Sequence, residues 1–227
     1  MLSKLDVPKA PSIVSTARTA LSKARTSPYC VRRVRQSTVA ALGFFRKRIA
    51  TSGAVDDILA AVEGSERGCC TSRSQKARIN AALGVLEEAG DNTRPISKGL
   101  SATWKMVWTT EKETLFILQN AGLFRTQAGD VYQVIDTDAL TLQNVITFPP
   151  DGAFCVQSNI ELVDSQRVQF NFVSASLKLP RRVLQLPPYG KGWFDTVYMD
   201  NKIRVSKDSR GDTLIVTRDG PPRDVTA

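Results

Sequence analysis

Apolar residues recur at every second position in a series of short runs that fill the chain from Gly99 onward. Alternation with a period of two is typical of strands that bury one face. Turn-forming residues separate the runs, and no segment between them is long enough for the crossover helix that parallel strands need. The runs that we interpret as strands are residues 102–108, 131–135, 140–148, 154–162, 167–177, 193–199, 203–205 and 213–216. This series of antiparallel strands, within about 120 residues, predicts a mainly β domain that closes as a barrel or packs as a sandwich.

Residues 51–92 precede these strands and predict a helical hairpin. In each half, apolar residues fall at i, i+3, i+4 and i+7, which is the spacing of one helix face. Glycines at 64 and 68 interrupt the pattern between the halves, and Gly90 ends it. The apolar positions are Val55, Ile58, Leu59 and Val62 in the first half and Ile79, Ala82, Leu83 and Leu86 in the second. Each helix has a single apolar stripe, so we expect the pair to pack against the sheet.

The net charge of +9 is concentrated in the first fifty residues, which hold eleven Lys or Arg against Asp6 alone. The remaining residues hold 20 basic and 21 acidic side chains and are nearly neutral. A basic segment that is rich in Ser and Thr and poor in acids is typical of an organelle transit peptide, and this one lacks the long apolar core of a secretory signal. We therefore predict that residues 1–50 are a disordered transit peptide. The alternative interpretation is a basic tail that binds nucleic acid through phosphates. Composition alone does not separate a plastid from a mitochondrial address.

The chain contains no histidine. This removes the commonest general base, the usual metal ligand and every Ser-His or Cys-His nucleophile. The four cysteines form no CxxC pair that could hold zinc. The carboxylates that remain stand among basic residues in turn-rich sequence, where surface ion pairs are the default, and they are Asp195, Asp200, Asp208 and Asp212. We therefore expect no catalytic residue, no metal site and no cofactor, and a carboxylate-dependent enzyme is the weaker alternative.

Two of the strands offer candidate walls for an apolar pocket. In each strand, three large apolar residues share one face because they are two positions apart. The two sets are Trp104, Met106 and Trp108 in the first strand and Val168, Phe170 and Phe172 in the fifth. We expect both sets to point into the barrel and to line a site for one apolar ligand. The alternative is that they only fill the interior, as side chains do in most small barrels.

Two stretches of the sequence carry a family resemblance. The first is residues 192–205, GWFDTVYMDNKIRV, with residues 210–216, RGDTLIV, and the second is residues 100–110, LSATWKMVWTT. They resemble the C-terminal signature and the opening strand of the plastid lipid-associated proteins, or plastid fibrillins. The resemblance spans about residues 54–217. The residues that carry the C-terminal signature are Trp193, Asp195, Tyr198, Asp200, Arg204 and Gly211.

The resemblance implies a lipocalin-like β-barrel, which we place at residues 93–220, and we expect residues 221–227 to form a flexible tail. It implies a plastid (chloroplast) protein that associates peripherally with plastoglobules or thylakoid membranes and binds prenyl lipids, carotenoids or related apolar compounds. The alternative function is an accessory subunit that binds an enzyme of plastid isoprenoid or quinone synthesis. Once the basic leader is removed, we expect no binding to nucleic acid.

Overall fold

The computed structural model describes residues 49–90, 96, 99–124, 126–188 and 190–226. The chain separates into two compact units, Met1–Gly43 and Phe44–Ala227, and every described residue lies in the second unit. The predicted transit peptide, residues 1–50, lies outside the described residues except for its last two positions.

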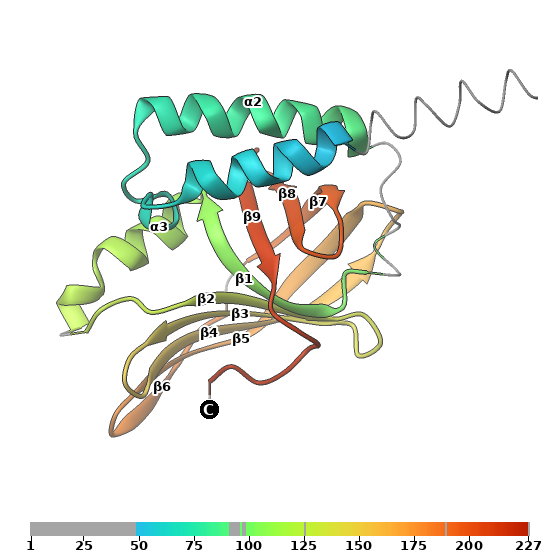
Figure 1. The fold of residues 1–227 in the computed structure, drawn as a ribbon. Coiled ribbons are helices and arrows are strands. Elements are labelled where there is room, and N and C mark those ends of the chain that lie inside the picture. Colours follow the sequence, from blue (N-terminus) through green and yellow to red (C-terminus); the bar gives the residue numbers. More distant parts are fainter. Residues whose placement is uncertain (1–48, 91–95, 97–98, 125, 189, 227) are drawn as a thin grey trace, which may run out of the picture. The chain divides into compact units, whose positions relative to one another are not determined.

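Within the described ranges, nine antiparallel strands form one sheet that closes on itself as a barrel (Figure 1). The strands are β1 (Ala102–Thr109), β2 (Val131–Asp136), β3 (Thr141–Phe148), β4 (Gly152–Leu162), β5 (Arg167–Leu179), β6 (Arg182–Leu186), β7 (Lys191–Met199), β8 (Ile203–Asp208) and β9 (Thr213–Arg218). Eight of these strands make the barrel, which is closed by the pairing of β4 with β5 and of β1 with β9. β6 pairs only with the second half of β5, whose first half pairs with β7. The predicted antiparallel barrel is confirmed.

Two helices lie side by side across the outside of the barrel, over β1, β9, β8 and β7 (Figure 1). The first is described over residues 49–62, and the second is α2 (Arg73–Gly90). A capping box begins α2: the Gln75 backbone N–H donates to Ser72 Oγ at 3.2 Å, and the Ser72 backbone N–H donates to Gln75 Oε1 at 2.9 Å. Gly90 ends the helix where a Cβ would collide with the carbonyl oxygen of Val197. The helical hairpin expected before the barrel is confirmed.

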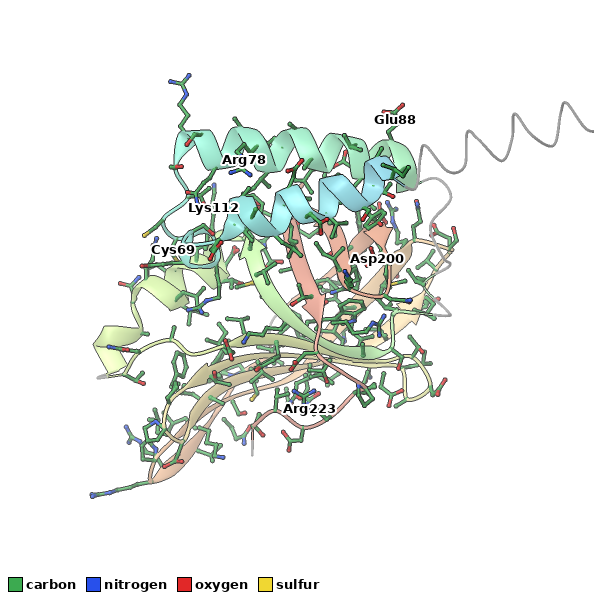
Figure 2. The ribbon with its side chains drawn as sticks, viewed as in Figure 1. Cys69, Arg78, Glu88, Lys112, Asp200 and Arg223 are labelled. Atoms are coloured by element: carbon green, nitrogen blue, oxygen red, sulfur yellow. The ribbon has the colours of Figure 1, made fainter. Side chains whose placement is uncertain are left out.

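The apolar stripes of the two helices face the barrel, as the sequence predicts. Ile58, Ile79 and Leu86 are fully buried and pack in one cluster with outward-facing side chains of β8 and β9. Charged residues take the opposite side, and Figure 2 shows Glu88 on α2 pointing away from the barrel. No helix in the described ranges is long and apolar enough to cross a membrane.

The barrel interior has a packed half and a hollow half. In the packed half, Trp104, Ile135 and Val168 are fully buried. Ile96 and Leu100, which precede β1, belong to the same cluster, and the indole N–H of Trp104 donates to the Leu100 carbonyl oxygen at 2.8 Å. The hollow half lies toward the other end of β1, where the chain turns into α3 (Lys112–Gln119) and the short helix η3 (Ala121–Phe124).

Two elements of the structure, besides the short helix η3, were not predicted. α3 has only eight residues, which is too short for a helical period to stand out among the strand runs. β6 lies between prolines at 180 and 187, and all five of its residues are exposed, so its sequence lacks the alternation of a half-buried strand. Both elements border the hollow half of the barrel.

Residues 221–226 lie against the outside of the barrel. The Thr103 hydroxyl donates to the Pro221 carbonyl oxygen at 2.8 Å, and Lys178 Nζ donates to the Thr226 carbonyl oxygen at 2.8 Å. Val225 packs against a small outward-facing apolar cluster on β3 and β4 that includes Val145. The outer face of these strands is therefore apolar enough to hold the segment.

Candidate functional site

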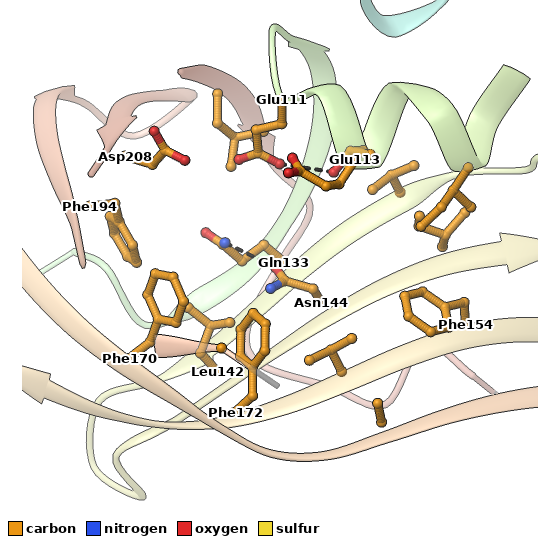
Figure 3. Close-up of a pocket in the computed structure, with 18 of the residues that line it drawn as sticks. Glu111, Glu113, Gln133, Leu142, Asn144, Phe154, Phe170, Phe172, Phe194 and Asp208 are labelled. Carbon is orange, nitrogen blue, oxygen red and sulfur yellow. Dashed lines mark hydrogen bonds between the residues drawn. The ribbon is translucent and has the colours of Figure 1, made fainter. Parts of the chain in front are cut away.

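A cavity of about 670 Å³ occupies the hollow half of the barrel (Figure 3). This volume lies inside the range of roughly 300–1,000 Å³ that small-molecule sites span. Large apolar side chains from five strands form its walls: Met106, Leu142, Phe154, Phe170, Phe172 and Phe194. α3 contributes Thr114 and Ile117 at one end, and Leu186 and the two prolines after β6 contribute at another edge. The hollow is therefore built mainly of apolar surface.

Three phenylalanine rings form a continuous part of the wall. The ring centroid of Phe170 lies 5.4 Å from that of Phe172 and 6.5 Å from that of Phe194, and both pairs are stacked. Two glycines make room for these rings. A Cβ at Gly190 would come within 2.7 Å of the Phe172 ring, and a Cβ at Gly192 would come within 2.9 Å of the Phe170 ring. The glycines just before β7 and at its start thus shape the cavity wall.

A short polar chain interrupts the apolar wall. Arg204 is fully buried, and its Nη2 donates to Oε1 of Gln133. Gln133 Nε2 in turn donates to Asn144 Oδ1 at 3.0 Å, and both amides line the cavity. The guanidinium carbon of Arg204 lies 5.1 Å from the ring centroid of Trp104 and 5.3 Å from that of Phe194. Arg204 Nε and Nη1 have no hydrogen-bond acceptor among the described residues. Burial, together with the charge of Arg218, lowers the pKa of Arg204 to about 9.

Carboxylates gather where α3 meets the cavity. Burial raises the pKa of Glu111, although a hydrogen bond from the Thr114 hydroxyl at 2.9 Å partly opposes this. Arg210 forms ion pairs with Glu113 and Asp208, at N–O distances of 2.5 and 3.2 Å. The cavity lining therefore carries three carboxylates and two cations, because Lys191 lines it as well and Arg210 bridges two of the carboxylates.

Four carboxylates were candidate acids and bases in the sequence. In the structure they form hydrogen bonds that stabilise turns and strand pairs. Asp195 receives two hydrogen bonds of 2.8 Å from Arg167. Asp200 and Asp208 accept backbone N–H groups in the turns that follow β7 and β8. Asp212 accepts the Thr110 hydroxyl at 2.8 Å. Among the described residues, no group of three or more acidic or Cys side chains could hold a metal ion.

The six predicted wall residues have three different environments. Met106, Phe170 and Phe172 line the cavity. Trp104 and Val168 point inward but are fully buried in the packed half. The inward orientation predicted for Trp108 is wrong: its ring packs beneath the two outer helices, and its indole N–H donates to Thr71 Oγ1 at 2.9 Å.

A β-bulge explains the position of Trp108. Met106 is paired with Val216, and Trp108 is paired with the adjacent Ile215. Val107 is therefore an extra residue of β1 without a partner position on β9. Such a bulge breaks the alternation of faces. Val107 and Trp108 consequently both pack on the helix side.

The residues of the C-terminal signature lie mostly outside the cavity. Arg167 stacks over Trp193, 3.8 Å from the ring centroid, while it pairs with Asp195. The Tyr198 hydroxyl donates to Asp200 Oδ2 at 3.1 Å. Gly211 forms the turn between β8 and β9 with φ of +84°, a conformation that favours glycine. Arg204 differs from the others because it extends into the barrel interior.

The polar members of the cavity were not predicted from the sequence. Gln133 lies between Val131 and Ile135 on the inward face of β2. Asn144 likewise lies between Leu142 and Ile146 on the inward face of β3. A polar residue at an inward position of an alternating strand is a signal that could have identified both. The residues from α3 gave no such signal because the helix itself was not predicted.

Comparisons with known proteins show which sequences this chain is similar to. The PAP_fibrillin family model matches residues 53–217. The chain is 51% identical over 163 residues to the probable plastid-lipid-associated protein 11, chloroplastic, of Arabidopsis thaliana, covering 71% of this chain and 77% of that protein. It is 23% identical over 191 residues to plastid-lipid-associated protein 6, chloroplastic, of the same plant, covering 70% and 67%. No solved structure gives a significant match.

Proposed function

Because this chain belongs to the PAP_fibrillin family of plastid lipid-associated proteins, we propose that its barrel holds one apolar lipid, such as a prenyl lipid or a carotenoid, in the cavity. The observation that carries this proposal is the phenylalanine-walled hollow of about 670 Å³. Apolar surface that leaves water gains roughly 25 cal/mol per Å², so such a wall favours a ligand over solvent.

The relatives also support the location of this role. The two Arabidopsis relatives are named chloroplastic and plastid-lipid-associated. We propose that the protein works in the plastid, at plastoglobules or thylakoid membranes, and these relatives give no support to the mitochondrial alternative. The accessory-subunit role stays a prediction, and co-purification with an enzyme but without lipid would favour it.

Replacing Phe172 by alanine should weaken binding of an apolar lipid. Phe172 supplies one ring of the cavity wall, and loss of its contact area with a ligand is worth about 1.5–3 kcal/mol, or about 10- to 100-fold in Kd. The measurement is equilibrium binding of plastoquinone to the full chain in the absence of vesicles.

Val173→Ala is the matched control, because Val173 is the next residue of β5, does not line the cavity and is 45% exposed. We expect its Kd to equal that of the unmodified chain. Equal losses from both substitutions, or no binding by the unmodified chain, would overturn the proposed function.

The β5–β6 hairpin supports contact with a lipid surface. Val183, Leu184 and Leu186 are 56%, 36% and 38% exposed, and two exposed arginines lie beside them, Arg181 in the turn and Arg182 at the start of β6. Leu186 also lines the cavity, so the exposed apolar surface is continuous with the ligand site. Apolar side chains beside arginines suit an anionic membrane interface. We propose that this hairpin docks the barrel on anionic lipid.

Val183→Asp should therefore reduce co-sedimentation of the full chain with vesicles of phosphatidylglycerol and phosphatidylcholine, by about tenfold in partition coefficient. The control is Val163→Asp, since Val163 is similarly exposed at 46% but lies in the β4–β5 turn, at the other end of β5 from the hairpin. If both variants lose the same amount of binding, the hairpin is not the docking element.

A further inference from the structure

We propose that the cavity selects apolar ligands that carry an uncharged carbonyl oxygen, and that buried Arg204 sets this preference through Gln133 and Asn144. The inference rests on the proposed function, because it concerns the same cavity. It adds a chemical class of ligand and a residue-level cause.

The hydrogen bonds of Arg204, Gln133 and Asn144 can run in only one direction. An arginine only donates, so the atom of Gln133 that faces Arg204 has to be its oxygen. The amide nitrogen of Gln133 therefore faces Asn144 and requires the oxygen of Asn144 as its acceptor, at 3.0 Å. The remaining group of Asn144 is its amide NH₂. Arg204 thus fixes the orientation of both amides in sequence.

The cavity consequently presents the amide NH₂ of Asn144 to a ligand. Asn144 lines the cavity and is half-buried, and its Nδ2 donates to no acceptor among the described residues. Figure 3 shows Gln133 and Asn144 joined by their hydrogen bond, among the aromatic wall residues and the two labelled glutamates. A ligand with an acceptor at this point would satisfy an N–H donor that a hydrocarbon would leave without a partner. The polar chain therefore favours a ligand that accepts a hydrogen bond.

The surroundings of Asn144 also affect which charge the acceptor of the ligand can carry. Gln133 and Asn144 line the cavity, whereas Arg204 lies behind them and offers no surface to a ligand. A carboxylate could not pair with the guanidinium of Arg204 directly. Two other cations line the cavity, Lys191 and Arg210, but Arg210 is already paired with Glu113 and Asp208, and Glu111 adds a third carboxylate. Like charges repel at such a site. The geometry favours a ketone, ester or quinone oxygen over an acid.

Binding of four radiolabelled probes to the full chain tests this preference: heptadecane, 2-heptadecanone, 2-heptadecanol and heptadecanoic acid. We expect the ketone to bind about tenfold more tightly than the alkane, as one additional hydrogen bond supplies, and the acid to bind more weakly than the ketone. Asn144→Leu should make the ketone and the alkane equal while the alkane still binds. If no probe binds, the proposed function fails. If the ketone and the alkane bind equally to the unmodified chain, only this inference fails. Tighter binding of the acid would show that a cation at the cavity, Arg204, Lys191 or Arg210, pairs with it, and this would overturn the inference.

Gln133→Glu tests the positioning role of Arg204. A carboxylate at this position accepts from Arg204 but has no N–H for Asn144, so the Asn144 amide should rotate and present its oxygen to the cavity. The ketone should then bind no better than the alkane, whereas the alcohol, which can donate, should keep its affinity. A purely structural role would lower binding of ketone and alcohol alike. The midpoint of thermal unfolding checks that the variant folds.

Discussion

Replacing Trp104 by alanine is expected to lower the free energy of unfolding by about 3–5 kcal/mol, the range for a large aromatic residue in a packed core. Trp104 is fully buried, and its indole N–H donates to the Leu100 carbonyl oxygen at 2.8 Å. The guanidinium groups of Arg204 and Arg218 also lie over its ring. Truncation would open a void in the closely packed half of the barrel. Urea unfolding of the full chain measures the loss of unfolding free energy.

Phe172→Ala is the matched comparison, because it removes a ring of the same barrel whose surroundings are already hollow. Phe172 is partly exposed and borders the cavity, so its truncation enlarges an existing space. We expect a loss of about 1–2 kcal/mol, close to the transfer free energy of the buried atoms alone. Equal losses at the two positions would show that the barrel is packed throughout, which would contradict a ligand cavity bounded by Phe172.

The alternation of apolar residues predicted the barrel because closed antiparallel strands bury one face along their whole length. It could not predict where that alternation changes phase. A bulge at Val107 moves Trp108 to the helix side, and another irregularity in β5 brings Ala175 to the cavity wall after Phe172. Such bulges depend on how a strand fits its two neighbours, which is a property of the closed sheet and is absent from any single run of sequence.

The boundary between packing and pocket was also not predictable. Trp104 and Met106 are two positions apart on the same face, yet one is sealed in the packed half and the other lines the cavity. The difference comes from what fills the two ends. Leu100 and its neighbours pack into one end, whereas α3 lies at the other without filling it. Both segments lie outside the regular strands, so strand periodicity carries no information about them.

Replacing Arg204 by an apolar residue should make the protein more stable. The double variant Arg204→Met with Gln133→Leu is expected to raise the free energy of unfolding by about 1–4 kcal/mol in urea at pH 7. Arg204 is a fully buried cation with two nitrogens that lack an acceptor among the described residues, and replacing a buried charge by apolar atoms of similar volume removes its desolvation cost. Arg204→Met alone should gain less, because it leaves the Gln133 oxygen without its donor.

The pH dependence of this gain follows from the pKa of Arg204, which burial lowers to about 9 in the folded chain, well below that of an ordinary arginine. Below pH 9 the group is protonated in both the folded and the unfolded chain, so the gain should be constant from pH 6 to 8. Above pH 9 the folded chain releases the proton first, the unmodified protein becomes more stable as pH rises, and the difference between the two proteins should shrink. A double variant that is less stable than the unmodified chain at pH 7 would mean that Arg204 stabilises the barrel. A more stable variant that no longer prefers the ketone would indicate that Arg204 serves ligand selection at the expense of stability.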